Sequence, residues 1–245
     1  MVTNISDKLV KDTHNQLILP LLSSPRLGRE DFLTGTANKK AKKLITSWPD
    51  WPSNIVVLIG PQGSGKSHLA AIWSQMSNAP IIHSRCITCY NPTGIACDKP
   101  LVIEIDEDHV SEIAQEFLFF IVNTINIHGN YAVVTSRLPI SSYKLVIPDL
   151  ASRLRAALPL TLDEPDDTLL EAILLKLFRD RGISISNETI VYITRRIERS
   201  YSAAISLVHK LDCESLITKS PITRAMVHFI MDRNSTTEQT RLYGT

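Results

Sequence analysis

The sequence predicts an α/β protein in which a parallel sheet flanked by helices is followed by a small all-helical domain. Three observations support this fold class. Short runs rich in β-branched residues alternate with helical stretches up to about residue 164, a pattern typical of a parallel sheet buried on both faces. A glycine-rich turn joins the first of these runs to a helix. After Pro165 the strand-like runs stop, and only helical periodicity remains.

The first part of the chain is predicted to hold an arm and then the sheet domain. Residues 1–25 are expected to form an extended arm, and residues 26–164 the α/β domain. A first helix is predicted over Thr36–Ser47, where apolar residues recur at helical spacing until two Trp-Pro pairs interrupt them. Five strands are predicted after it: IVVLI (55–59), PIIH (80–83), LVIEI (101–105), YAVVT (131–135) and LPLTL (158–162).

The second part, residues 165–233, is predicted to be a helical domain. Asp166 and Asp167 are suited to the N-cap and first turn of a helix, and Gly182 is placed to end it. Residues 234–245 are polar and are expected to form a disordered tail. The further predicted helices are Asn187–Glu198, Ser202–Asp212 and a last one from Ser220-Pro221 to about Asp232.

Composition and charge exclude several classes of protein. The 245 residues are 44% hydrophobic and 21% charged, so the chain can bury a full core. The net charge of +1 gives no general basic field for nucleic acid, although a local patch remains possible. No apolar run reaches the length of a membrane span, and the N-terminus lacks a signal-peptide core. A soluble cytoplasmic protein without a membrane partner is therefore expected.

Three cysteines lie close together and raise the question of a zinc site. Cys86 and Cys89 have a spacing that can share one metal ion, and Cys97 follows soon after. A fourth ligand is not obvious, because His83 is the only nearby histidine and Cys213 lies far away. We therefore interpret the cluster as reduced cytosolic thiols.

The glycine-rich turn matches the phosphate-binding P-loop pattern G-x-x-x-x-G-K-[ST]. Its backbone N–H groups, with the positive end of the following helix, are suited to surround phosphate oxygens. Lys66 is expected to neutralise the phosphates and Ser67 to bind Mg²⁺. The predicted nucleotide-binding residues are Gly60, Pro61, Gln62, Gly63, Ser64, Gly65, Lys66, Ser67 and His68.

Two acids after the strand LVIEI predict the second half of a nucleotide-hydrolysing site. Asp106 is expected to hold the metal together with Ser67, and Glu107 to orient or deprotonate the attacking water. Glu104 is unusual because a carboxylate inside a buried strand needs a partner. A solvated strand end is the alternative interpretation of these acids.

Several segments together resemble one family. WPDWPSNIVVLIGPQGSGKSHLA, VVTSRLPI and PDLASRLRAALPLTLDEPDD are similar to the AAA+ core of the replication initiator DnaA. The resemblance is closer to its short relatives of the Hda family, called HdaA in alphaproteobacteria, and runs from about Gln16 to Asp232. It implies an AAA+ P-loop NTPase fold whose helical domain acts as a lid on bound ADP or ATP with Mg²⁺.

The resemblance also implies roles for four polar residues. Thr135 and Ser136 match the family's sensor 1, which contacts the γ-phosphate or the attacking water, and Ser136 is taken as the catalytic hydroxyl. Arg153 matches the arginine finger that reaches a neighbour's nucleotide, and Arg199 matches sensor 2 of the lid. The residues that compete for these last two roles are Arg155, Arg195 and Arg196.

The N-terminal arm carries a segment similar to the sliding-clamp-binding peptide of Hda proteins. Such peptides bind in an extended form, with a few side chains as anchors. Simple packing of the leucines on the domain edge is the alternative. The residues expected to bind the clamp are Gln16, Leu17, Leu19, Pro20 and Leu21.

The implied function is regulation of chromosomal replication initiation. A clamp-bound protein of this family promotes hydrolysis of the ATP bound to DnaA and so inactivates the initiator, with at most a weak ATPase activity of its own. No helix-turn-helix domain follows the lid, so sequence-specific DNA binding is not expected. An AAA+ helicase loader and a small-molecule kinase are the rival interpretations, and self-assembly of the chain is left open.

Overall fold

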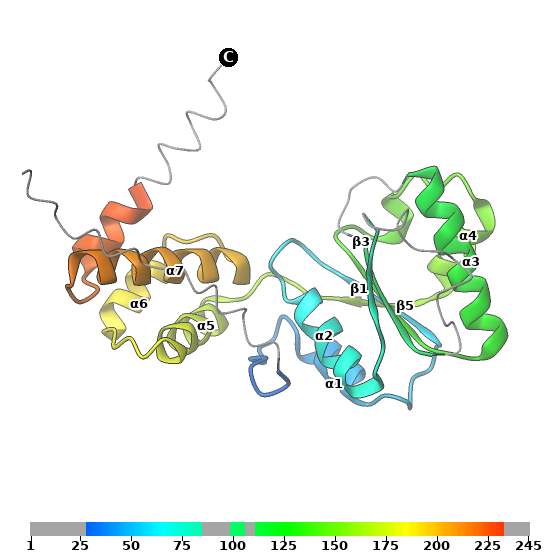
Figure 1. The fold of residues 1–245 in the computed structure, drawn as a ribbon, viewed down its shortest axis with the longest axis horizontal. Helices are drawn as coiled ribbons and strands as arrows, with labels where there is room; N and C mark the ends of the chain where they lie inside the picture. Colours follow the sequence, from blue (N-terminus) through cyan, green and yellow to red (C-terminus); the bar gives the residue numbers. More distant parts are fainter. Residues whose placement is uncertain (1–27, 85–98, 106–110, 233–245) are drawn as a thin grey trace, which may run out of the picture.

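The protein is described by a computed structural model over residues 28–84, 99–105 and 111–232. The sheet domain and the helical domain lie side by side along the long axis of the molecule (Figure 1). Between them runs the chain that leaves the last strand, and the segment before the first helix lies beside it. Among the described helices, none is long and apolar enough to cross a membrane.

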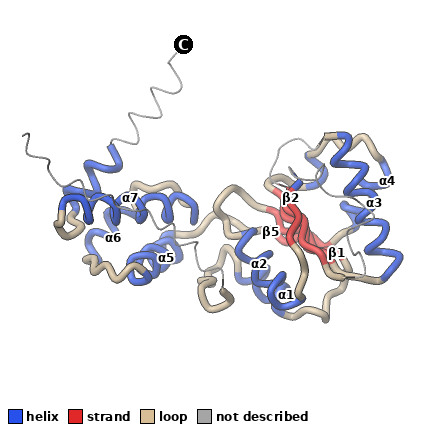
Figure 2. The backbone as a smooth tube through the Cα atoms, viewed as in Figure 1, coloured by secondary structure: helices blue, strands red, loops and turns tan. Residues whose placement is uncertain are grey.

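The sheet has five parallel strands in the order β2-β3-β4-β1-β5. Each strand is a short apolar run, so a helix is needed on both faces to exclude water. Figure 2 shows the strands stacked between two helical layers. The strands are β1 Ile55–Ile59, β2 Ile81–His83, β3 Leu101–Ile105, β4 Ala132–Ser136 and β5 Leu158–Thr161.

Alternate residues of each strand face different helices, which divides the core of this domain in two. Val56 and Leu58 pack with α1 Lys39–Thr46 and α2 Lys66–Ser77. Ile55 and Val57 pack with α3 Glu112–His128 and α4 Pro148–Ala156. The period-2 alternation therefore assigns every residue of a strand to one helical layer.

The lid is built from α5 Asp167–Asp180, α6 Asn187–Thr194, α7 Tyr201–Thr218 and a helical stretch over residues 224–232. Its core is separate from those of the sheet domain and is centred on buried side chains such as Leu170, Phe178 and Val208. Burying side chains of this size contributes about 1.5–3 kcal/mol each. The lid is therefore stabilised by a hydrophobic core of its own.

The predicted elements are confirmed with shifted ends. Asp166 caps α5 by accepting a hydrogen bond from the Leu169 N–H at 2.8 Å, and Gly182 follows that helix with a φ of 69°. The predicted first helix is shorter and starts at Lys39, because Gly35 and Asn38 bond to each other in a turn before it. Helix α6 ends at Thr194, short of the predicted Glu198, and α7 continues past Asp212 because no proline or glycine stops it before Ser220-Pro221.

Candidate functional site: a nucleotide cleft under the lid

The P-loop joins β1 to α2 in the strand–turn–helix arrangement that the motif requires. Gly63 and Gly65 adopt φ angles of 75° and 97°, which side chains rarely tolerate. Gly65 is the N-cap of α2, so the first turn of that helix opens into the loop. Ser67 is exposed in that turn, where its hydroxyl is accessible to a metal ion.

Lys66 is held across the mouth of this loop. Its Nζ donates to the carbonyl oxygens of Gly60 and Pro61 at 2.8 and 2.7 Å, and only 7% of the residue is exposed. Ser64 contributes a buried hydroxyl that has no hydrogen-bond partner among the described residues. A buried cation and an unsatisfied hydroxyl at a glycine loop fit the binding of phosphate oxygens.

The lid contacts the loop directly through the start of α7. The backbone N–H of Tyr201 donates to the carbonyl oxygen of Gly63 at 2.8 Å. A Cβ atom at Gly63 would lie 2.9 Å from the Cβ of Ser200 and 2.5 Å from the hydroxyl of Ser202. Glycine is therefore required here by the lid as well as by the backbone angle.

A cleft extends from the loop between the lid and the segment that precedes α1. Its enclosed volume is about 30 Å³, room for a couple of water molecules at the ~10–15 Å³ that each requires. The cleft is lined by Asp31, Phe32, Leu33, Ala37, Asn38, Gly63, Ser64, Gly65, His68, Asp163, Pro165, Leu169, Ile173 and Tyr201.

His68 forms part of this wall and is 5% exposed. Its Nε2 lies 3.1 Å from the carbonyl oxygen of Gly28, and because a carbonyl only accepts, Nε2 carries the proton. The ring packs edge-on against Phe32 at 5.1 Å. Burial disfavours the imidazolium and lowers the pKa of His68. The predicted nucleotide contact of His68 thus takes the form of a neutral wall of the cleft.

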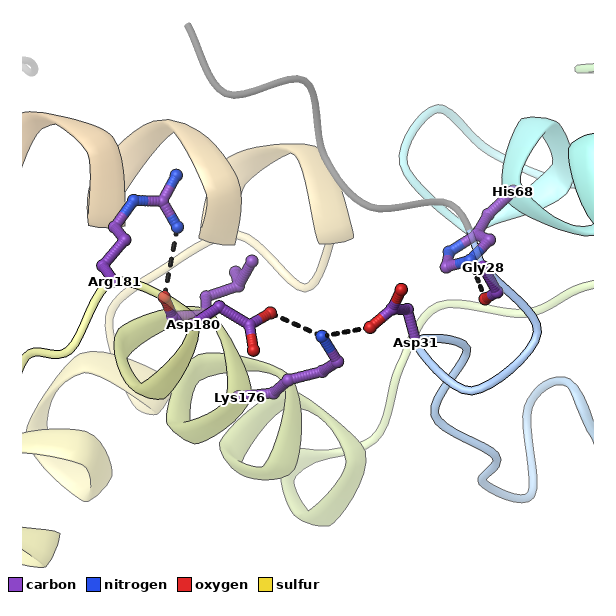
Figure 3. Close-up of polar contacts among 7 residues, drawn as sticks. Gly28, Asp31, His68, Lys176, Asp180 and Arg181 are labelled. Carbon is purple, nitrogen blue, oxygen red and sulfur yellow. Dashed lines mark hydrogen bonds and ion pairs between the residues drawn. The ribbon is translucent and has the colours of Figure 1, made fainter. Parts of the chain in front are cut away.

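A lysine of the lid ties the two sides of the cleft together (Figure 3). Lys176 on α5 lies between two carboxylates, with its Nζ 2.8 Å from Asp31 Oδ1 and also paired with Asp180. Burial alone would lower the pKa of Lys176, but the two hydrogen-bonded carboxylates outweigh it and raise the pKa. The hydrogen bond from Lys176 lowers the pKa of Asp31. Neither residue belongs to a motif, so the sequence gives no sign of this bridge.

The strand ends beside the P-loop distinguish the two candidate sensor hydroxyls. Ser136 donates to the carbonyl oxygen of Leu138 at 2.6 Å and contacts the Tyr143 hydroxyl at 2.9 Å. Thr135 faces the α2 side, as Val133 does, and its buried hydroxyl has no partner within the described ranges. The geometry therefore favours Thr135 over the predicted Ser136.

The third carboxylate of the strand end has the partner that its burial requires. Glu104 Oε2 lies 3.0 Å from His83 Nδ1, and Glu104 is 7% exposed. The predicted metal and water ligands Asp106 and Glu107 lie outside the described residues, as do Cys86, Cys89 and Cys97. Among the residues that are described, no group of three or more His, Cys, Asp or Glu side chains could hold a metal ion.

The two predicted arginines both lie at the surface. Arg153 projects from α4 with 37% of its side chain exposed and its Nε 3.0 Å from Asp149. Arg199 precedes the N-cap Ser200, outside α7, and its Nη2 lies 2.8 Å from Asp167 Oδ1 at the start of α5. Arg199 is thus paired with a carboxylate of the lid itself.

We compared the sequence and the structure of the chain with those of known proteins. No family model matches the chain. Domain III of the Thermotoga maritima initiation protein DnaA superposes with a TM-score of 0.71 at 17% identity, over 85% of this chain and 97% of that one. The chain has the AAA+ fold. A Thermotoga maritima RuvB mutant also matches it, with a TM-score of 0.65 at 18% identity over 82% of this chain and 71% of that one.

The sequence comparison points to the same group of AAA+ proteins. The chromosomal replication initiator protein DnaA of Thermomicrobium roseum is 24% identical in an alignment 234 positions long that covers 83% of this chain. This chain spans about half, 49%, of that relative's length. A DnaA bound to AMPPCP and single-stranded DNA matches with a TM-score of 0.65 at 17% identity, over 80% of this chain and 68% of that one. The chain is DnaA-like, and its narrower resemblance to Hda stays a prediction.

Gly63→Ala should weaken nucleotide binding by roughly tenfold or more, because the new methyl group meets Ser200 and Ser202 and pushes the lid from the loop. Gly129→Ala is the matched control. Gly129 shares a positive φ of 65° but has no atom within 4 Å of the added Cβ, so it carries the backbone strain without the collision. Titration of both variants with ADP measures the difference. Equal affinities in the two variants would contradict the contact between lid and loop.

Acidification should destabilise the protein through His68. Its folded pKa lies below the ordinary value of 6.5, so the unfolded chain takes up the proton first. The stabilisation by His68 is therefore complete above about pH 6.5 and is lost as the pH falls below it. Melting temperatures between pH 7.5 and 5.5 should fall more steeply for the wild type than for His68→Asn. Parallel slopes would show that His68 does not stay neutral in the fold.

Proposed function

We propose that the chain is a nucleotide-binding, cytoplasmic regulator of replication initiation that acts on DnaA together with the sliding clamp. In this role it promotes hydrolysis of the ATP bound to DnaA, which leaves the initiator in its inactive ADP form. The observation that carries the proposal is that the P-loop and Arg153 lie in different places on the molecule. The P-loop is covered by the chain's own lid, whereas Arg153 lies outside that cleft, with 37% of its side chain exposed and its Nε paired with Asp149.

The enclosed part supports ADP or ATP as a bound ligand. Lys66 and the P-loop N–H groups suit the phosphates, and the apolar side chains Phe32, Leu169 and Tyr201 suit the base. Ser67 and Asp106 would hold Mg²⁺, whose chemistry is to neutralise phosphate charge. The structures that match this chain include DnaA bound to AMPPCP. The lid contact at Gly63 gives the nucleotide a means to set the angle between the domains.

The exposed part supports action on a second molecule. Arg153 lies on α4, which packs against α3 on the sheet face opposite the P-loop helix α2. It has no part in the lining of the chain's own cleft. A guanidinium combines fixed positive charge with a planar set of donors, which suits it to the charge that spreads over a transferring phosphoryl group. A finger in that position can serve only a nucleotide held by a neighbour.

The test is a single-turnover assay of DnaA-bound ATP with DNA-loaded clamp present. The wild-type chain should accelerate hydrolysis, and Gln16→Ala, a change in the arm outside the described residues, should abolish this acceleration because the chain no longer binds the clamp. Asn187→Ala, at the start of α6, is a control of similar size in the lid. Hydrolysis that never rises above the rate of DnaA alone, with ADP supplied, would contradict the proposal. A helicase loader would then become the better interpretation.

A further inference from the structure

A second hollow lies in the lid and shares no residue with the nucleotide cleft. It measures about 470 Å³ and is formed by α6 and the helical stretch over residues 224–232. In Figure 1 these two helices lie in the half of the molecule farthest from the sheet. The lining residues are Tyr192, Arg196, Arg224, Ala225, His228, Met231 and Asp232.

Two arginines in this hollow are placed on one aromatic ring. The guanidinium carbon of Arg196 lies 3.9 Å from the centre of the Tyr192 ring, and that of Arg224 lies 4.3 Å from the same centre. The two positive charges are thus separated by no more than the sum of these distances, which is close to the Debye length of about 8 Å at physiological ionic strength. Salt screens their repulsion only weakly, and the attraction of each guanidinium to the ring offsets only part of that repulsion.

Within the described part of the chain, neither arginine has a carboxylate within ion-pair distance. Three other arginines differ in this respect, since Arg153, Arg181 and Arg199 each pair with an aspartate. The one carboxylate in the lining, that of Asp232, lies 2.8 Å from Nδ1 of His228. The hollow therefore concentrates positive charge that the lid itself does not balance.

We propose that the Arg196–Arg224 pair is a binding site for a phosphate group. Stacking on Tyr192 fixes the planes of both guanidinium groups. Arg196 Nη1 also donates to the Tyr192 carbonyl oxygen at 3.5 Å, and the remaining N–H groups can donate in pairs to phosphate oxygens. One anion at the edge of the Tyr192 ring, within reach of donors from both guanidinium groups, would relieve their repulsion. The Tyr192 hydroxyl, which has no hydrogen-bond partner among the described residues, adds a further donor.

The phosphate can be carried by a small molecule or by the backbone of single-stranded nucleic acid. The volume of the hollow falls in the range of small-ligand pockets, about 300–1,000 Å³, and its position at the surface also admits a chain. The whole protein has a net charge of only +1, so binding must come from the local pair. Two phosphate contacts on a single strand predict a slope of about −1.4 in log affinity against log salt.

The experiment measures two probes against three arginine variants. One probe is a fluorescein-labelled 15-nucleotide oligo(dT), followed by anisotropy, and the other is pyrophosphate, followed by calorimetry. Arg196→Ala and Arg224→Ala should each weaken binding of the active probe about tenfold or more. Arg179→Ala removes the same charge from an exposed position on α5 and should leave affinity within about twofold.

A Lys66→Ala background separates this site from the P-loop, which also attracts phosphate. Binding that survives Lys66→Ala but is lost with Arg196→Ala or Arg224→Ala supports the proposal, and the probe that binds identifies the carrier of the phosphate. Equal losses in Arg179→Ala, dependence on Lys66 alone, or binding to neither probe would overturn it. Binding only to vesicles of phosphatidylglycerol would overturn it as well. Unchanged melting temperatures confirm that the surface variants remain folded.

Discussion

Lys66→Ala will remove nucleotide binding, with a loss of affinity of about 100-fold or more. The ammonium lies at the mouth of the loop and is held there by two carbonyl oxygens. A phosphate that replaces these carbonyl contacts gains a charge-assisted interaction in a site with little water, where hydrogen bonds to charged groups contribute about 1.5–3 kcal/mol each. Equilibrium binding of a fluorescent ADP analogue measures the loss.

The same substitution leaves the carbonyl oxygens of Gly60 and Pro61 without their donor, so stability must be measured beside affinity. The melting temperature of Lys66→Ala without nucleotide gives that cost. Lys43→Ala, on the exposed side of α1, removes an equal charge away from the cleft and should bind as the wild type does. A folded Lys66→Ala protein that binds ADP normally would show that this loop is a structural turn.

Arg153→Ala will abolish stimulation of hydrolysis on DnaA while the chain's own nucleotide binding stays unchanged. An arginine finger contributes about 10³–10⁵ in rate where it acts, so even the lower figure would bring hydrolysis back to the rate of DnaA alone. Stimulation should be lost while nucleotide binding is kept, because Arg153 lies on α4 and the cleft is lined by residues of other elements. Single-turnover hydrolysis and ADP titration, run on the same preparation, measure the two quantities.

Arg155→Ala tests whether the effect belongs to position 153. Arg155 is exposed on the same helix and carries the same charge, so general attraction between the proteins would be weakened equally by either change. Loss confined to Arg153→Ala supports the finger. If Arg155→Ala shows the greater loss, the assignment moves to Arg155. If Arg153→Ala instead weakens the chain's own ADP binding, the proposed action on a neighbour is wrong.

Sequence patterns were sufficient wherever the cause is local. The run IVVLI gave β1 with both ends correct, since continuous β-branched residues between turns leave few alternatives. The N-cap Asp166 was predictable because a carboxylate needs only the N–H groups of the next turn. The P-loop is likewise a local sequence whose glycine angles follow from its turn.

The rest depends on contacts between distant segments, which no pattern reports. Lys176 and Asp31 meet only because α5 folds back beside the segment before α1. Thr135 and Ser136 look equivalent in the sequence, and the choice between them depends on the side of the sheet that each faces. The Arg196–Arg224 pair also joins two helices, through a tyrosine whose periodicity marks it only as a core residue.

The ion pair between Lys176 and Asp31 links the lid to the segment before α1, so that the free energies of these two parts depend on each other. Asp31, Phe32 and Leu33 line the cleft, and they lie six to eight residues after the end of the predicted arm at residue 25. Any change of lid angle that displaces Lys176 therefore changes the free energy of the segment that carries the arm. Thermodynamic linkage is reciprocal. If nucleotide binding changes the affinity of the arm for its partner by some factor, binding of that partner changes the affinity for nucleotide by the same factor. Under the proposed function, occupancy of the cleft and binding of the clamp through the arm are therefore a single coupled equilibrium.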